Sequence, residues 1–344
     1  MDVTVNDQAI AELGLSVGES GPPIAQAGET TSMATAREWL TERRGAFGAA
    51  LARYGCLLVR GLPIESVHDF AGARDVLLDQ RVSYREKATP RSDYGEGVLS
   101  STDLPSAQVI RLHNENSYTL DFPGILLFGC LVAPEEGGAT TVADTREVLA
   151  RVPAELADRF RRLGWVLARN YREHVSLPWS TAFGTSDRAT VEDYCRRSSI
   201  GYRWLPDGGL ATTQRRATTI HHPGTGEEVW FNHIAFWNQH SLDPDIRDVL
   251  LTSYGPDGLP FDTLYGDGSP IDAEDIAALN AAYDGAQRRE PWRPGDLLLV
   301  DNILSCHGRE AFRGDRKILV AMGEQVSLAD CRPTVEPAPE PVAG

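Results

Sequence analysis

Apolar residues recur every three or four positions in several stretches of the chain, a spacing that predicts helices with one buried face. Three such stretches cover residues 35–54, 67–78 and 145–163. Gly55 suits the C-terminal cap of the first helix, because glycine adopts the left-handed backbone without strain. Pro153 is expected to divide the third helix in two, since proline cannot continue the hydrogen-bond ladder.

Continuous apolar runs and short segments bounded by turn residues predict the strands. They span 56–59, 109–115, 125–132, 137–144, 228–231, 292–302 and 316–322, and the fourth and sixth of them begin with a turn. Further helices are expected near 246–251 and 273–283.

The remaining stretches show no regular period. Residues 1–34 are rich in Gly, Ser, Thr and Pro and are interpreted as a loosely ordered N-terminal arm. Residues 327–344 are interpreted as a flexible C-terminal tail. Between them, residues 35–326 are expected to form a single domain with an insertion at about 170–290, because no break in composition marks another boundary. Residues 84–106 carry several Gly and Pro residues and predict an irregular loop.

The composition, 42% hydrophobic and 24% charged over 344 residues, is typical of a soluble globular protein. A net charge of -16 argues against binding to nucleic acid or to an anionic membrane, because the mean field repels phosphate. No apolar run approaches the roughly 18 residues of a membrane span, and the first residues lack the features of a signal peptide. Five scattered cysteines without a C-x-x-C pair argue against a disulfide framework. A cytoplasmic location is therefore expected.

Candidate chemistry lies in the predicted strand 109–115. Side chains two positions apart share one face of a strand, so His113 and Glu115 are expected to project into the same cavity. A second, distant histidine would complete a facial triad of two imidazoles and one carboxylate on ferrous iron. Taken alone, the pair also fits a satisfied histidine beside an ordinary glutamate. His307, expected in a loop at the mouth of two core strands, is the candidate for the missing ligand.

Four motifs occur in a fixed order along the chain. They are His113-Asn114-Glu115, Gly137-Gly138-Ala139-Thr140, Val229-Trp230-Phe231-Asn232, and the block from Pro294 to His307-Gly308-Arg309 that is followed by Gly314-Asp315-Arg316. Together they resemble the taurine dioxygenase and clavaminate synthase superfamily of iron(II)/2-oxoglutarate oxygenases, over residues of about 50 to 325. The resemblance implies a mainly β fold, a double-stranded β-helix of the jelly-roll kind with flanking helices.

The same resemblance assigns roles to individual residues. It implies that His113, Glu115 and His307 are the metal ligands, while Thr140 helps to hold 2-oxoglutarate and Arg316 pairs with its distal carboxylate. A guanidinium suits this task because its planar fork grips a carboxylate with two parallel hydrogen bonds. Arg309 and Arg313 are competing candidates; Arg316 is preferred because it opens the predicted strand, whereas Arg313 belongs to a turn.

The implied reaction consumes 2-oxoglutarate and O2 at Fe(II), releases succinate and CO2, and hydroxylates an unactivated carbon. The residues of these motifs resemble those of oxygenases in bacterial natural-product pathways. This resemblance implies a free or carrier-protein-tethered amino acid as substrate, with oxidation at the β-carbon favoured. Desaturation, epoxidation and cyclisation are alternatives. The halogenating branch of the superfamily replaces the carboxylate ligand by a small residue, so Glu115 favours oxygenation.

Several weaker candidates remain. Arg91 could bind a substrate carboxylate, and Asn232 lies where the family places a residue of the substrate pocket. His221 and His222 are adjacent and would face opposite sides of a strand, so they are interpreted as bystanders. A zinc hydrolase using the same triad and a non-catalytic barrel that serves as a binding module are the hypotheses from other classes.

Overall fold

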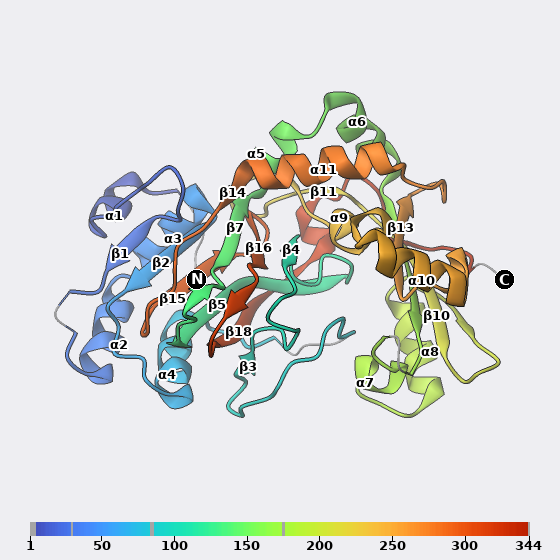
Figure 1. Cartoon of the computed structure of the whole chain (residues 1–344). Helices are drawn as coiled ribbons and strands as arrows, with labels where there is room; N and C mark the ends of the chain where they lie inside the picture. Colours follow the sequence, from blue (N-terminus) through green and yellow to red (C-terminus); the bar gives the residue numbers. More distant parts are fainter. Residues whose placement is uncertain (1–4, 29, 83–85, 174–175, 343–344) are drawn as a thin grey trace.

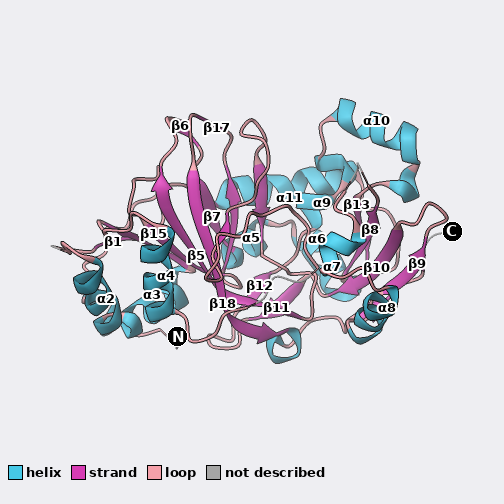
Figure 2. Ribbon diagram, turned by 90° about the horizontal axis from the view of Figure 1, so that it is seen from below, coloured by secondary structure: helices cyan, strands magenta, loops and turns pink. Residues whose placement is uncertain are grey.

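The computed structural model describes residues 5–28, 30–82, 86–173 and 176–342. In this part of the chain, helices lie at both ends of the molecule and along one side of the central sheets (Figures 1 and 2). The expected mainly β architecture is therefore wrong in its proportions: the fold mixes helices and sheets. The difference arises largely within residues 170–290, where the expected short strands are accompanied by α7 (Trp179–Phe183) and α8 (Arg188–Arg197).

The largest sheet has six strands in the order β1-β2-β15-β5-β18-β3, all antiparallel except the parallel pair β1 and β2. The apolar runs predicted as strands form its centre. The six strands are β1 (Ile24–Gln26), β2 (Cys56–Arg60), β15 (Leu297–Asp301), β5 (Asp121–Val132), β18 (Lys317–Ser327) and β3 (Leu99–Ser100).

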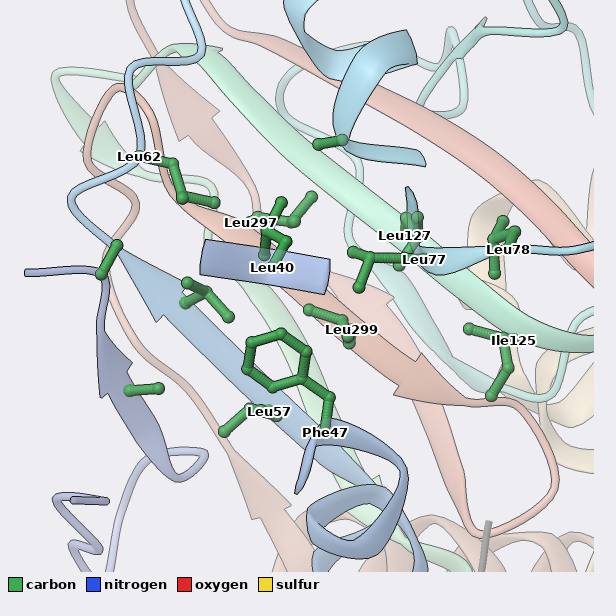
Figure 3. Packing of buried hydrophobic residues seen from close by; sticks show 14 of the residues in the cluster. Leu40, Phe47, Leu57, Leu62, Leu77, Leu78, Ile125, Leu127, Leu297 and Leu299 are labelled. Atoms are coloured by element: carbon green, nitrogen blue, oxygen red, sulfur yellow. The ribbon is translucent and has the colours of Figure 1, made fainter. Parts of the chain in front are cut away.

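Three helices cover one face of this sheet, namely α2 (Met33–Glu42), α3 (Arg44–Tyr54) and α4 (Val67–Leu77). Leu57, Leu127 and Leu299 point from three neighbouring strands into this layer and pack with Phe47 (Figure 3). Phe128, the next residue along β5, belongs to a separate cluster on the opposite face. This alternation explains why the central strands are apolar throughout.

A second sheet, in the order β14-β7-β16-β4, packs on that opposite face. Val142 of β7 shares a buried cluster with Phe128 and Leu298 of the large sheet, so the two sheets form layers around one interior. This arrangement is consistent with a jelly roll. The strands are β14 (Gln287–Arg288), β7 (Thr140–Asp144), β16 (Ser305–Arg309) and β4 (Ile110–His113), and a short pair beside them joins β6 (Glu136–Gly137) to β17 (Phe312–Arg313).

A third sheet lies at the other end of the molecule from the N-terminal helices (Figure 1). It consists of β8 (Trp165–Tyr171), β9 (Gly201–Trp204), β10 (Leu210–Arg216), β13 (Phe261–Tyr265) and β19 (Ala338–Pro339). The hairpin of β11 (Thr219–His221) and β12 (Glu228–Trp230) leads into α9 (Ile234–Trp237), which packs against β4. The remaining long helices are α10 (Pro244–Tyr254) and α11 (Ala273–Ala286).

The helix predictions can be compared with the observed elements. The break at Pro153 is confirmed, because α5 (Thr145–Arg151) and α6 (Ala154–Leu163) lie on either side of it. The predicted single helix 35–54 is instead the pair α2 and α3, since Arg43 leaves the helical conformation at φ −104° and ψ 6°. None of the described helices is both long and apolar enough to cross a membrane.

Both ends of the described chain pack on the rest of the molecule. Ile10 of α1 (Asp7–Ala11) and Ala25 of β1 are buried, and β1 pairs with β2. Near the other end, Cys331 is buried and β19 pairs with β10. Parts of both terminal segments are therefore packed in the described residues, and the division into an arm at 1–34, a domain at 35–326 and a tail at 327–344 stays a prediction.

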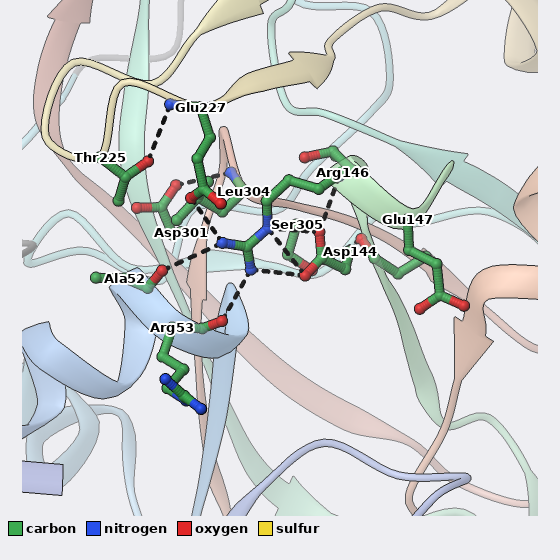
Figure 4. A network of polar contacts seen from close by, with 12 residues as sticks. Ala52, Arg53, Asp144, Arg146, Glu147, Thr225, Glu227, Asp301, Leu304 and Ser305 are labelled. Carbon is green, nitrogen blue, oxygen red and sulfur yellow. Dashed lines mark hydrogen bonds and ion pairs between the residues drawn. The ribbon is translucent and has the colours of Figure 1, made fainter. Parts of the chain in front are cut away.

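A polar corner joins the second sheet to the helical layer (Figure 4). Arg146 donates to Asp144 (2.6 Å), to Glu227 (2.8 Å) and to two main-chain carbonyls at the end of α3. Thr145, the residue before Arg146, adds a further contact, because its amide donates to the Leu304 carbonyl at 2.9 Å. The end of β7 is thereby held beside the turn between β15 and β16.

Candidate metal centre

Two histidines and one glutamate converge between the two main sheets. His113 is the last residue of β4, and His307 lies directly opposite it in the neighbouring strand β16. Glu115 follows two residues after the end of β4, in a turn. All three are buried, and among the described residues they form the only group of three or more His, Cys, Asp or Glu side chains placed to hold one metal ion.

The route to this convergence differs from the expected one in two respects. Glu115 is not part of the strand, because the chain turns after Asn114 and Asn116 takes a left-handed backbone with φ 55°. His307 is not in a loop, because the ladder between β16 and β4 continues through it. Cross-strand pairing thus places the two imidazoles together, and the turn returns the carboxylate to them.

The donor atoms suit a divalent transition metal. One ligand atom from each side chain lies within 4.8 Å of those of the other two, and Glu115 Oε2 is 3.6 Å from His307 Nε2. His113 Nδ1 lies 2.8 Å from the Arg111 carbonyl, an interaction that needs the proton on Nδ1 and leaves Nε2 free to bind. Two imidazole nitrogens and one carboxylate oxygen are the donor set of the iron facial triad.

Burial keeps both imidazoles in the form that binds metal. Desolvation lowers the pKa of His113, and the nearby Glu115 carboxylate only partly opposes this. Desolvation together with the proximity of His113 and Arg91 holds the pKa of His307 well below its usual value. Neutral imidazoles present a lone pair, so the site offers nitrogen donors at neutral pH.

Asn302, immediately after β15, orients the carboxylate ligand through the backbone. Its Oδ1 accepts from the Glu115 amide at 2.7 Å, and its Nδ2 donates to the Glu115 carbonyl at 2.9 Å and to the Pro123 carbonyl at 2.8 Å. The Asn302 carbonyl in turn accepts from Asn114 Nδ2 at 2.7 Å. Sequence reasoning missed this role, although the signal was present in the Asp301-Asn302 pair that follows an apolar strand.

Replacing Asn302 by aspartate tests that role. Aspartate keeps the acceptor for the Glu115 amide but turns the donor that faces two carbonyls into a carboxylate oxygen, so the turn loses its fixed position. We expect iron affinity to fall by about 10- to 100-fold, as is typical when a residue that orients a ligand is lost. Isothermal titration with Fe(II) under argon measures this, and unchanged affinity in a folded variant would rule the role out.

His222 stabilises the end of strand β15, the residue before Asn302. Its Nε2 lies 3.1 Å from Asp301 Oδ2, and its Nδ1 accepts from the amides of Gly224 and Thr225. These contacts assign the proton to Nε2, which donates to the carboxylate. Neither His222 nor its neighbour His221 belongs to the triad, but His222 is not a bystander to the fold, because it fixes the strand end that carries Asn302.

Thr140 and Arg316 contact each other at the cavity that His113 and His307 also line. Arg316 donates to the Gly138 carbonyl (2.9 Å), to Ser101 Oγ (2.9 Å) and to Thr140 Oγ1 (3.4 Å). All of these except Gly138 line one cavity together with His113 and His307. Burial lowers the pKa of Arg316 to about 10, which leaves the guanidinium charged at neutral pH. A half-buried cation therefore lines the same cavity as two of the candidate metal ligands.

The two competing arginines lie differently. Arg309 lines the same cavity, but its guanidinium donates to main-chain carbonyls of the loop, among them Pro105 at 2.7 Å and Gln108 at 2.8 Å. Arg313 is 78% exposed and pairs with Glu136 at 2.5 Å. Of the three, Arg316 alone both lines the cavity and donates to side-chain hydroxyl groups of other lining residues, Ser101 and Thr140.

Arg91 and Asn232 have contrasting positions. Arg91 reaches the triad, where its Nη2 donates to Glu115 Oε2 at 2.8 Å, and both side chains are 5% exposed. Asn232 is fully buried; its Oδ1 accepts from the Ile234 amide at 3.0 Å and its Nδ2 donates to the Thr218 carbonyl at 3.3 Å. These are the contacts of a residue that positions α9, and Asn232 does not line the cavity at the triad.

Comparison with known proteins adds a family and several relatives. The family model described as taurine catabolism dioxygenase TauD, TfdA family matches residues 17–322. The dapdiamide synthesis protein DdaC of Enterobacter agglomerans is 36% identical over 276 residues, or 80% of this chain and 84% of DdaC. A clavaminate synthase-like protein of Arabidopsis thaliana is 25% identical over 282 residues, or 78% of this chain and 81% of the relative. The structure of PvcB from Pseudomonas aeruginosa shares the fold, with a TM-score of 0.54, 16% identity and 97% coverage of both chains.

Proposed function

This chain belongs to the taurine catabolism dioxygenase TauD, TfdA family, and we propose that it oxidises an unactivated carbon of an amino-acid-like substrate in a natural-product pathway. The family resemblance inferred from the motifs is confirmed, and the protein is an oxygenase that depends on iron and 2-oxoglutarate. One observation carries the proposal for the site: two imidazoles and a carboxylate are placed to hold one metal ion, and the two imidazoles line a cavity together with the half-buried guanidinium of Arg316.

His113, Glu115 and His307 are proposed to hold the iron from one side. When bound, iron and 2-oxoglutarate would activate O2, which is the oxidant: 2-oxoglutarate would be oxidised to succinate and CO2, and the second oxygen atom of O2 would serve to oxidise a C–H bond of the substrate. Three protein ligands on one side leave the remaining coordination positions open for small molecules. The buried surroundings of the triad keep bulk water away from these positions.

Thr140 and Arg316 are proposed to bind the distal carboxylate of 2-oxoglutarate. The Arg316 fork already donates to neutral oxygens of Ser101 and Thr140, which a carboxylate can replace or join. No acidic side chain is among the residues that line this cavity, whereas Arg91, Arg309 and Arg316 are. A dianionic cosubstrate is the ligand that this charge distribution favours.

Arg91 is proposed to bind a carboxylate of the substrate. The space at the triad amounts to about 20 Å³, which holds about one water molecule, so a side chain must move when a larger molecule enters. Arg91 belongs to the loop that borders the cavity. Its guanidinium contacts the carboxylate of Glu115, which is also the proposed ligand of the metal. With a metal held by Glu115, this carboxylate would bind Arg91 less strongly, and the Arg91 guanidinium would then be able to pair with a carboxylate of the substrate.

Hydroxylation, with the β-carbon favoured, is the proposed outcome, and Glu115 at the third ligand position supports oxygenation over halogenation. Desaturation, epoxidation and cyclisation are alternative outcomes of the same chemistry. The name of DdaC, a dapdiamide synthesis protein, supports a biosynthetic role. The amino-acid-like substrate is proposed to be either free or presented by a carrier protein.

Succinate release tests this proposal, with a panel of free and carrier-bound amino acids as substrates. We expect release to need Fe(II), 2-oxoglutarate and O2, and we expect Arg91→Gln to raise the substrate KM by about tenfold or more because a charge-assisted hydrogen bond is lost. Arg313→Gln is the control, since Arg313 is exposed and paired with Glu136. Turnover without 2-oxoglutarate and O2 would instead indicate a zinc hydrolase.

A further inference from the structure

A second cavity, of about 590 Å³, lies beside the metal centre and has no part in the chemistry described so far. Five separate segments line it, namely 88–90, 104–111, 176–177, 236–242 and 260–261. We refer to it as the apolar groove. Its size is within the range of roughly 300–1,000 Å³ that is usual for small-molecule sites.

The apolar groove adjoins the triad on two sides. The Phe236 ring lines the groove and stacks on the His113 ring, with centroids 4.7 Å apart and an interplanar angle of 28°. Pro90 also lines the groove, and the next residue, Arg91, reaches Glu115. A molecule whose carboxylate is held by Arg91 therefore lies beside the groove, because the loop that carries Arg91 also lines the groove.

Aromatic and aliphatic side chains form most of the groove wall. Trp237 and Phe261 stack on each other at 4.8 Å and 13°, and Leu104, Leu177 and Leu242 complete the apolar lining. The stack is anchored from behind by His233, whose ring lies 4.2 Å from Trp237. A wall fixed in this way favours an apolar ligand group, because burial of that group removes its surface from water without rearranging the protein.

The charge of the lining residues further limits which kinds of ligand can bind in the groove. The chain contains 49 Asp and Glu residues, yet none is among the described residues that line the groove, and Arg111 is the one charged side chain of this described lining. The cavity at the triad is likewise lined by cations and no acid. Apart from Glu115, which is proposed to bind the metal, a free α-ammonium group would find no carboxylate partner among the described residues that line either cavity, and an unpaired buried ammonium is costly.

We infer that the substrate is an N-acylated amino acid, with its carboxylate at Arg91 and its apolar acyl chain in the groove. Acylation removes the ammonium charge that the lining does not match, and it supplies the apolar group that the lining does match. This inference rests on the proposed function, because it uses the same metal centre and the same role of Arg91.

Equilibrium dialysis under argon, with Fe(II) and 2-oxoglutarate present, tests the inference without turnover. N-hexanoyl amino acids are compared with the same amino acids in free form. We expect the N-hexanoyl forms to bind about tenfold or more tightly, since each buried methylene contributes to affinity. Equal binding of the two forms, or no binding of any N-hexanoyl form, would overturn the inference.

Two variants, in which glutamate replaces a leucine inside the groove or an isoleucine outside it, test whether the preference for N-hexanoyl forms arises in the groove. Leu242→Glu places a carboxylate in the groove and is expected to abolish the preference for N-hexanoyl forms. Ile246→Glu, at a position on α10 that is 56% exposed and outside the groove lining, is expected to retain it. A preserved preference in Leu242→Glu contradicts the location.

The visible charge-transfer band of each sample shows whether iron and 2-oxoglutarate are bound, whereas dialysis shows whether the N-hexanoyl forms bind better. A missing band with folded protein counts against the iron and 2-oxoglutarate site, and dialysis still reports on the groove. A normal band without any preference for the N-hexanoyl forms counts against the N-acyl inference alone.

Discussion

Replacement of His307 by alanine is expected to abolish the metal-to-ligand charge-transfer band that anaerobic Fe(II) and 2-oxoglutarate give with the unaltered protein. His307 supplies one of only two imidazoles in the triad, and no other described His, Cys, Asp or Glu side chain is placed to take its position. We expect iron affinity to fall by more than about 100-fold, beyond the loss typical of a residue that merely orients a ligand.

A matched control is available for this experiment. His221→Ala removes a half-buried histidine whose Nδ1 lies 3.3 Å from the Arg332 carbonyl, away from the triad, and is expected to keep the band. Glu115→Ala is expected to retain some iron but to lose hydroxylation, because two imidazoles remain. Full activity in Glu115→Ala, or a normal band in His307→Ala, would show that the ligands are assigned wrongly.

Arg316→Lys is expected to weaken 2-oxoglutarate binding by about tenfold to 100-fold while iron still binds. Lysine keeps the positive charge but loses the planar fork that donates two parallel hydrogen bonds to one carboxylate. The loss of one charge-assisted hydrogen bond costs about 1.5–3 kcal/mol, which corresponds to this change in Kd. Titration of the charge-transfer band with 2-oxoglutarate under argon gives the affinity directly.

The two other arginines make this experiment discriminating. Arg313→Lys is expected to leave the affinity unchanged, because Arg313 is exposed and paired with Glu136. Arg309→Lys is expected to loosen the loop whose carbonyls it binds and to change 2-oxoglutarate affinity less than Arg316→Lys. A larger effect at Arg309 or Arg313 than at Arg316 would move the cosubstrate anchor.

Most elements of the fold could be predicted from local patterns, and the errors have physical causes. The apolar runs at 56–59, 125–132 and 297–300 became central strands because a strand covered on both faces needs no polar positions. The proportion of helix was underestimated within residues 170–290. Short amphipathic segments there, such as α8, are stabilised by packing on a separate sheet, which no local period reveals.

The candidate site shows the same division. The residue types at 113, 115, 140, 307 and 316, together with their order along the chain, are enough to indicate an iron and 2-oxoglutarate site. Their convergence agrees with that expectation, although Glu115 arrives through a turn and His307 through a strand. The chemistry was readable because ligand identity is a property of single side chains.

The sequence by itself thus determined which residue types are candidates for the ligands and their order along the chain, and it indicated most of the strands near them. Only the tertiary structure decided which distant groups hold those ligands in place: Asn302 lies 187 positions from Glu115 and grips its backbone. It also decided that Arg91 rests on Glu115 and that an apolar groove without acidic groups adjoins His113. The reason is physical, since local sequence patterns report the period and polarity of one element, whereas these contacts depend on how separate sheets and loops pack against each other.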